Sequence, residues 1–250
     1  MLRKVLGLVF FISILFNLTA SAQTVDELIS KNLEARGGME KLKAATSMKM
    51  SGKMLFQGME APFTIYAARP NSVRIDMTLQ GKTMVQAYDG QTAWMIMPFM
   101  GSTDPEKMPE EASKEIQEQA DFDGPLVDYK EKGHTVELIG KEDLEGTEVY
   151  KLKVTLKNGD VRYVYLDGET FVELKWTGIR KRQGAEFEVD TYLSDYKPVD
   201  GLVFPHAIES KVKGQTMNQM TVEKIELNVP VDEAMFKMPA KTTEKQPAKQ

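Results

Sequence analysis

The sequence contains no cysteine in its 250 residues. Disulfide bonds, thiolate metal sites and a cysteine nucleophile are therefore excluded, and no cysteine can receive a lipid anchor. A chain of this length can bury enough apolar surface to fold without covalent cross-links. We accordingly expect a mature chain that is soluble and not anchored to a membrane.

Histidine and catalytic motifs are also scarce. His134 and His206 lie far apart in the sequence, and neither has the short spacing to other ligands that a zinc site requires. Residues 121–124 (DFDG) match only a fragment of a calcium-binding loop. The adjacent carboxylates Glu110 and Glu111 are more typical of a solvated helix face than of an acid–base pair. With no nucleophile elbow, phosphate-binding loop or dinucleotide fingerprint, the sequence predicts no metal, no cofactor and no enzyme activity.

An excess of basic residues is missing as well. The chain has 32 Lys and Arg residues against 37 Asp and Glu, which gives a formal net charge of -5. Nucleic-acid binding needs basic stripes that neutralise phosphate, and anionic membrane surfaces attract polybasic segments. We therefore expect neither of these partners.

The one long apolar run stands at the N-terminus. Arg3 and Lys4 precede the apolar residues 5–18, and residues 20–22 (ASA) are the small residues of a cleavage site. The run is shorter than the roughly 20 residues that a spanning helix needs. We interpret residues 1–22 as an export signal that is cleaved after Ala22, with an uncleaved anchor as the alternative, and we predict a periplasmic location.

Helical spacing appears in two places. Thr24 and Glu27 form a capping box before an apolar stripe, which predicts a helix that Gly37 and Gly38 end, followed by a short helix over residues 39–45. The stretch over residues 94–124 interrupts the alternation, and after it no strand is expected until about Thr135. Pro109 and the apolar stripe of Ala112, Ile116 and Ala120 instead predict a helical insert after Phe99.

The rest of the chain alternates with period 2, which is typical of antiparallel sheet. The pairs Asn158-Gly159 and Asp167-Gly168 predict two-residue hairpins, and Asp200-Gly201 predicts a further turn. These signals give about ten or eleven strands. We predict one α+β domain over residues 23–239 with a large curled antiparallel sheet, and a disordered tail over residues 240–250. In the stretch DYKPVDGLVFPHAIES, His206 is expected at the surface or rim of the sheet.

Many apolar positions in these strands are methionine. Methionine can simply fill an ordinary core, but its flexible thioether also suits a lining that accepts ligands of variable shape. A curled sheet that its helices only partly fill leaves an apolar cavity. The candidate lining residues are Met48, Met50, Met54, Phe56, Ile75, Met77, Trp94, Ile96, Leu152, Val154, Leu174 and Trp176.

Residues 69–99 carry three motifs in order, namely Arg69-Pro70-Asn71, the segment from Asp89-Gly90 to Trp94, and Met97-Pro98-Phe99. In these motifs the chain resembles the LolA-like carriers of outer-membrane lipoproteins. The ending VPVDEAMFKMP, residues 229–239, is similar to the closing segment of the same family. Together with the leading helix and the helical insert, the resemblance spans essentially the mature chain. The N-terminal Gly-Gly helical hairpin and the acidic stretch over residues 104–118 depart from the family pattern.

This resemblance implies a half-open β-barrel whose N-terminal helix and helical insert form a lid over an apolar cavity. It implies a non-catalytic carrier for lipoprotein acyl chains or a related lipid, with an inner-membrane exporter and an outer-membrane acceptor as partners. By position, Arg69 would be the latch that hydrogen-bonds to the lid in the empty state. Two alternatives stay open: an envelope regulatory or scaffold module that senses lipoproteins or binds a protein, and a hydrolase that uses Glu110, Glu111 and Glu115.

Overall fold

The computed structural model describes residues 23–56, 58–182 and 184–241. The export signal expected at residues 1–22 lies outside this part of the chain, as does the tail from residue 242 onward. Three α-helices and a single antiparallel sheet make up the described part: α1 (Val25–Ala35), α2 (Met39–Ala44) and α3 (Glu110–Gln119). Two short 3-10 turns, η1 (Pro98–Met100) and η2 (Glu233–Met235), complete the helical elements of the described residues.

The helix signals of the sequence are confirmed. The Thr24 hydroxyl accepts a hydrogen bond from the Glu27 amide, and the Glu27 carboxylate accepts one from the Thr24 amide, so the capping box is complete. The third helix begins directly after Pro109. Its apolar stripe of Ala112, Ile116 and Ala120 faces the sheet, as the spacing predicted.

The described residues form thirteen strands, more than the ten or eleven expected. The interruption expected before Thr135 is not free of strands, because β6 (Ser102–Lys107) overlaps the start of the acidic stretch over residues 104–118. It is a short edge strand that pairs only with β5, so its charged side chains can stay in solvent and hide the usual strand pattern. The strands are β1 (Ser47–Phe56), β2 (Met59–Ala68), β3 (Ser72–Leu79), β4 (Lys82–Tyr88), β5 (Ala93–Met97), β6 (Ser102–Lys107), β7 (Thr135–Leu144), β8 (Thr147–Thr155), β9 (Val161–Asp167), β10 (Glu173–Arg182), β11 (Ala185–Val199), β12 (Leu202–Val212) and β13 (Gln215–Leu227).

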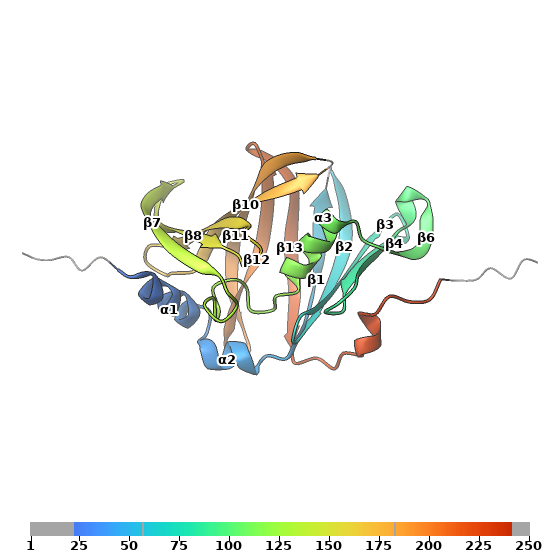
Figure 1. Cartoon of the computed structure of the whole chain (residues 1–250), viewed down its shortest axis with the longest axis horizontal. Coiled ribbons are helices and arrows are strands. Elements are labelled where there is room, and N and C mark those ends of the chain that lie inside the picture. The colour runs from blue at the N-terminus through green and yellow to red at the C-terminus, as the bar shows by residue number, and fades with distance from the viewer. Residues whose placement is uncertain (1–22, 57, 183, 242–250) are drawn as a thin grey trace, which may run out of the picture.

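The sheet consists of two meanders that join through β1 and β13. Its strand order is β6-β5-β4-β3-β2-β1-β13-β12-β11-β10-β9-β8-β7, and β6 and β7 remain as separate edges. The sheet curls around α3, which crosses the middle of its concave side, while α1 and α2 lie toward one end (Figure 1). This is the half-open barrel with a helical lid that the sequence predicted.

Gly52 marks the join between the two meanders. The β1–β13 register shifts between Ser51 and Gly52, where a bulge increases the local twist. A side chain at residue 52 could not fit, because its Cβ would lie 2.0 Å from the Thr221 carbonyl oxygen. Glycine therefore allows the close approach of β1 and β13 at the centre of the curl.

The predicted turns are only partly correct. Asp200 and Gly201 both have positive φ and connect β11 to β12, so the turn predicted there is confirmed. Asn158-Gly159 is instead part of a longer loop in which only Gly159 has positive φ, and the loop after Asp167 extends to Val172. Both predictions of two-residue hairpins there were wrong, because backbone amides donate hydrogen bonds to the side-chain oxygens of Asn158 and Asp167 and so stabilise wider loops.

His206 is buried, with 6% of its surface exposed, so its predicted place at the surface or rim was also wrong. Alternation along β12 places it on the same face as Leu202 and Phe204. Its Nδ1 lies 3.1 Å from the Phe204 carbonyl oxygen. The residue belongs to the inner layer of the cup.

Candidate functional site

The centre of the concave face carries a cluster of apolar side chains that are not fully covered. Phe63, Val222 and Ile225 are buried at its base. Cross-strand pairs extend it, since Met50 lies opposite both Ile65 and Ile225. Around the base lie side chains of intermediate exposure, among them Met48, Met50, Met54, Met77 and Met220. We call this set the central apolar face.

A second group of predicted lining residues belongs to a closed core. Leu152 and Val154 have no exposed surface, and Trp176 packs against the same cluster. Leu28 and Leu33 of α1 lie in this cluster and are buried with it. These positions therefore hold α1 against β7–β9 and are covered in this structure.

Four predicted lining residues lie outside both clusters, and the first two of them are on β5. Trp94 and Ile96 of β5 lie on the outer face of the sheet beside Val85 and Ala87 of β4. Met238 packs on this cluster, and the Trp94 indole donates a hydrogen bond to the Phe236 carbonyl. These two residues do not line the concave side.

Phe56 and Leu174 also stand apart from the central apolar face. Phe56 lies at the end of β1 and is 39% exposed. Leu174 falls in a register shift between Glu173 and Lys175, which interrupts the alternation that placed it beside Trp176. Ile75, by contrast, lies on the concave side and packs against the residues under α3.

The lid helix α3 spans the cup through two different kinds of contact. On one side Ile116 and Ala120 are buried against Val73, Tyr88 and Ala93 of β3–β5. On the other side its charged face meets β9 and β10. The helix therefore connects the two halves of the sheet across the concave side (Figure 1).

The polar side of this crossing is an ion-pair cluster. One Glu118 carboxylate oxygen lies 2.6 Å from Arg162 Nη2 and 3.1 Å from Arg180 Nη1. Glu115 adds a longer contact of 3.8 Å to Arg180 Nε. The Arg162 guanidinium also lies over the Trp176 ring, 4.8 Å from its centroid. The charged cluster thus sits directly beside the apolar interior.

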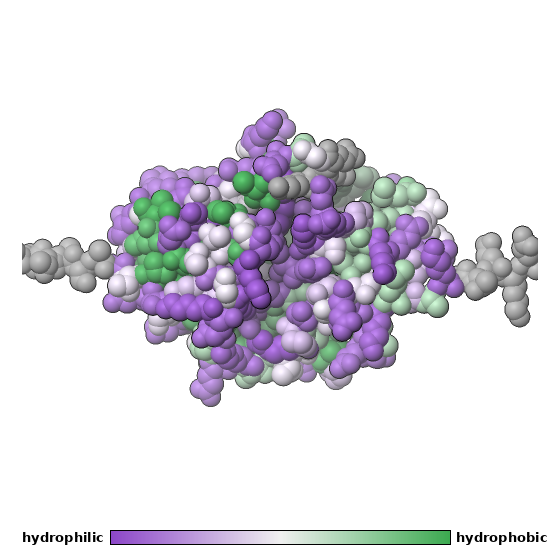
Figure 2. Space-filling view, in the orientation of Figure 1, coloured by the Kyte–Doolittle hydropathy of each residue, from purple (hydrophilic) through white to green (hydrophobic). Residues whose placement is uncertain are grey.

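A cleft of about 290 Å³ opens between α3 and β9–β11. Its lining is mostly charged, and in the space-filling view the surface between α3 and β10 is largely hydrophilic (Figure 2). An acyl chain would not be stabilised by such a lining.

The loop after α3 is held in place both by buried side chains and by ion pairs. Leu126 and Val127 are buried in the core cluster beneath α1, with 1% and 0% exposure. Lys132 pairs with Asp121 at 2.6 Å and donates to the Gly124 carbonyl, and Lys43 pairs with Asp128 at 2.8 Å.

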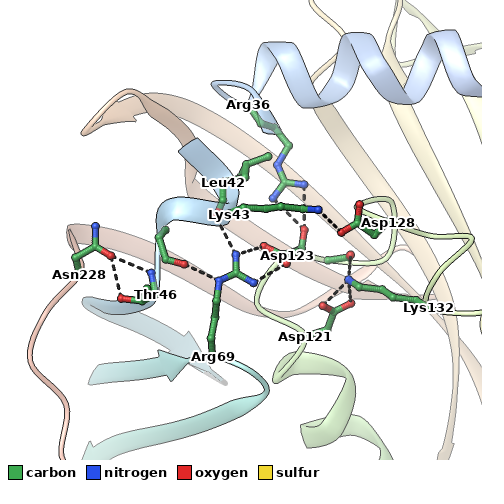
Figure 3. A network of polar contacts seen from close by, with 12 residues as sticks. Arg36, Leu42, Lys43, Thr46, Arg69, Asp121, Asp123, Asp128, Lys132 and Asn228 are labelled. Atoms are coloured by element: carbon green, nitrogen blue, oxygen red, sulfur yellow. Dashed lines mark hydrogen bonds and ion pairs between the residues drawn. The ribbon is translucent and has the colours of Figure 1, made fainter. Parts of the chain in front are cut away.

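Arg69 lies at the centre of this fixation (Figure 3). Its Nη1 and Nη2 donate to the two oxygens of Asp123 at 2.7 and 2.6 Å. Its Nε and Nη2 also donate to the carbonyls of Ala45 and Leu42, at the C-terminal end of α2. One side chain from the end of β2 thereby joins α2 to the loop that follows the lid helix.

Charge and burial oppose each other at Asp123. Burial raises the pKa of this carboxyl. The hydrogen bonds and the charge of Arg69, together with the charges of Lys132 and Arg36, lower it by more than burial raises it, so the pKa lies below its usual value. The hydrogen bond to Asp123 in turn raises the pKa of Arg69. Both groups remain ionised at neutral pH.

Sequence reasoning found Arg69 but missed its partner and the second cluster. Asp123 lies in the DFDG fragment, which matched no complete motif. Arg162 carried a signal, because it shares the inward face of β9 with the apolar Val164 and Leu166. A charged residue in an inward position of an apolar strand needs a partner, and here the lid supplies it.

Neither a metal-binding group nor a membrane-spanning helix is found among the described residues. In residues 23–56, 58–182 and 184–241, no group of three or more His, Cys, Asp or Glu side chains is arranged to hold a metal ion. No helix within the same ranges has the length and apolar character needed to cross a membrane.

Comparison with solved structures confirms the fold. A DUF1329 family protein from Desulfovibrio piger matches with a TM-score of 0.58 and 12% identity, over 85% of this chain and 97% of that one. A LolA superfamily protein from Nitrosomonas europaea matches with a TM-score of 0.56 and 12% identity, over 86% and 98%. A putative outer membrane lipoprotein-sorting protein domain from Vibrio parahaemolyticus matches with a TM-score of 0.55 and 13% identity, over 83% and 97%.

The structural neighbours are thus proteins of the LolA superfamily and of the lipoprotein-sorting type, in agreement with the resemblance found in the sequence. No family model matches the sequence, and no curated protein matches it. At identities of 12 and 13%, the likeness concerns the fold.

Proposed function

We propose that the protein is a non-catalytic carrier that binds the acyl chains of outer-membrane lipoproteins, or a related hydrophobic ligand, in the periplasm. The observation that carries this proposal is the central apolar face. Its methionine side chains are only partly covered, although they lie on the inner side of a curled sheet. Ordinary core residues at such positions would be closed off by helices.

The physical chemistry of acyl chains supports this role. Each methylene removed from water contributes about 0.8 kcal/mol, so a lipid with two or three chains needs a shield between membranes. Flexible thioethers adapt to chains of different length and shape. The structural neighbour from Vibrio parahaemolyticus is an outer membrane lipoprotein-sorting protein domain, which supports this class of cargo.

Release must accompany binding in a carrier. A lid that is closed in the empty state lowers the apparent affinity by the fraction of closed protein. The ion pairs and the thin apolar stripe of α3 supply such a closed state. We propose residues 23–239 as the carrier domain, and an inner-membrane exporter and an outer-membrane acceptor as the partners that load and unload it.

The first experiment is lipid analysis of the exported protein. The full chain, with its own signal, is produced in a bacterium with two membranes and purified from the periplasm without detergent. Mass spectrometry of the extract should detect acyl lipid, and the delipidated protein should bind a fluorescent diacylated peptide. Protein found in the cytoplasm, or protein that carries no lipid and never binds the peptide, contradicts the proposal.

Matched variants test whether the central apolar face is the binding surface. Met50→Gln and Met77→Gln keep side-chain length but add a polar amide, and together they should weaken peptide binding by about tenfold. Leu55→Gln is the control, because this residue is 43% exposed and lies one position out of phase with the inward side chains of β1. Equal affinities for both variants contradict the assigned surface.

A further inference from the structure

Two guanidinium groups on the concave side share a single carboxylate. The side chains of Arg162, Arg180 and Glu118 are only 14, 20 and 16% exposed, and both arginines contact the same Glu118 oxygen. Glu115 reaches Arg180 only at 3.8 Å and is 41% exposed. The close contacts therefore leave one positive charge without a carboxylate of its own.

Further carboxylates lie at longer range, since Glu111, Asp160 and Glu186 line the adjacent cleft together with Glu115 and Arg180. Asp121 and Glu173 attract Arg162 at longer range, but Asp121 forms its own ion pair with Lys132. Burial lowers the pKa of Arg162 and the charge of Arg180 lowers it as well, whereas the charge of Glu118 raises it. An oxyanion that replaces Glu118 would have to contact both guanidinium groups in the same way.

The location of the two arginines suits the polar end of an amphiphile. Alternation along β9 and β10 places Arg162 and Arg180 on the same face as Val154 and Trp176, at the boundary between the charged cleft and the apolar interior. The guanidinium fork matches the oxygens of a carboxylate or phosphate. A headgroup bound here could direct its alkyl chain toward the central apolar face.

The attachment of the lid couples this site to opening. Glu118 is the only α3 residue within 3.5 Å of both arginines among the described ion pairs, and the apolar stripe under α3 is narrow. The loop beyond α3 is held separately by Asp123 and by the buried Leu126 and Val127. An anion that replaces Glu118 would thus release the helix while its base stays in place.

We propose that Arg162 and Arg180 bind the oxyanionic headgroup of an amphiphilic ligand in place of Glu118, and that this exchange opens α3. This inference rests on the proposed carrier function and specifies the chemical class of its ligand. The Glu118 carboxylate then competes with the ligand headgroup for the two arginines. In the closed state Glu118 occupies the position that the headgroup takes in the loaded state.

The test compares three probes: dodecyl phosphate, dodecyl maltoside, which has the same alkyl chain and a neutral headgroup, and inorganic phosphate, which has no alkyl chain. Binding to the delipidated full chain is measured by calorimetry, with both detergents below their critical micelle concentrations. The wild-type protein should bind dodecyl phosphate at least about tenfold more tightly than either of the other probes. Inorganic phosphate that binds as tightly as dodecyl phosphate would show a simple anion site and overturn the proposal.

Three substitutions assign the effect to residues. Arg180→Gln should weaken dodecyl phosphate binding by about tenfold and leave dodecyl maltoside unaffected. Glu118→Gln removes the competing carboxylate and should tighten dodecyl phosphate binding by about tenfold. Lys153→Gln is the control, because it removes one positive charge from the outer face of the neighbouring strand β8.

The outcomes separate this inference from the carrier function. Opposite shifts for Arg180→Gln and Glu118→Gln, with Lys153→Gln unchanged, support the headgroup site. Equal binding of both detergents, unchanged in the two variants, overturns the headgroup site but leaves the carrier intact. Failure of both detergents to bind overturns the two proposals together. Because Glu118 lies on the lid, its variant stays informative even if Arg180→Gln does not fold.

Discussion

The Arg69 guanidinium binds both carboxylate oxygens of Asp123, at distances of 2.7 and 2.6 Å. The same guanidinium lies over the Phe122 ring, 4.8 Å from its centroid, and donates to two carbonyls at the end of α2. A position that the sequence assigned to a latch thus contacts the loop after the lid helix rather than the helix itself. Two sites of attachment follow, with Asp123 in the loop after the lid helix and Glu118 in the last turn of the helix.

The first prediction concerns Arg69. Arg69→Leu leaves Asp123 without its partner in a site where the two side chains are 26 and 12% exposed, so we expect the free energy of unfolding to fall by about 2 kcal/mol. Arg69→Lys keeps the charge but loses the bidentate geometry, and the loss should be about half as large. Urea denaturation of both variants checks this. Lys43→Gln, which breaks a more exposed ion pair to Asp128, should change stability much less than Arg69→Leu does.

If Arg69→Leu and Lys43→Gln destabilise the protein equally, the bidentate pair has no special role. The rate at which the protein releases a fluorescent diacylated peptide gives a second measure of the role of Arg69. Loosening the base should raise the fraction of open protein, so Arg69→Leu should hold a diacylated peptide longer than wild type. Unchanged loading and release would remove Arg69 from the lid mechanism.

The second prediction is a pH dependence. The pKa of Asp123 in the folded protein lies below its unfolded value of about 3.9, so this residue stabilises the fold above that pH. The contribution is lost as the pH falls from about 4 toward the folded pKa. Wild type should therefore lose more stability than Asp123→Asn between about pH 5 and pH 3, as measured by urea denaturation at each pH. Parallel losses in the two proteins would contradict the lowered pKa.

Local signals in the sequence predicted the elements that local interactions determine. The capping box at Thr24 and the start of α3 after Pro109 are correct, because both depend on residues within one helical turn. The alternation of the strands is correct for the same reason. Motif order along the chain was enough to indicate the LolA-like fold.

The faces of the strands could not be predicted in the same way. Alternation separates two sets of side chains, but it does not say which set lies inside. Trp94 and Ile96 look like inner residues, yet Phe236 and Met238 from the C-terminal segment cover them on the outside. The ion pairs from Arg69 to Asp123 and from Arg162 to Glu118 join residues that are distant in the sequence, so their partners emerge only in three dimensions.

The third prediction concerns the curl of the sheet. Gly52→Ala would place a Cβ 2.0 Å from the Thr221 carbonyl, and separating β1 from β13 to relieve this contact should lower the free energy of unfolding by about 3 kcal/mol. Gly178→Ala in β10 is the matched control, because nothing lies within 4 Å of its added Cβ. Thermal denaturation of both variants measures this difference in stability. A small effect at residue 52 would mean that the two meanders tolerate a wider join.

The last prediction separates the moving part of the lid from its fixed base. Ile116 is 2% exposed and is the largest apolar side chain by which α3 packs on β3–β5, so Ile116→Ala should weaken that contact by about 2 kcal/mol. Amide hydrogen exchange of residues 110–119 should then accelerate by about thirtyfold, while the amides of Gly124 and Lys132, which donate to the carbonyls of Asp121 and Asp128, keep their protection. Gln117→Ala, on the exposed side of the same helix, should change neither segment. Acceleration of both segments together would instead mean that α3 and its loop open as one unit, with Arg69–Asp123 as the contact that breaks.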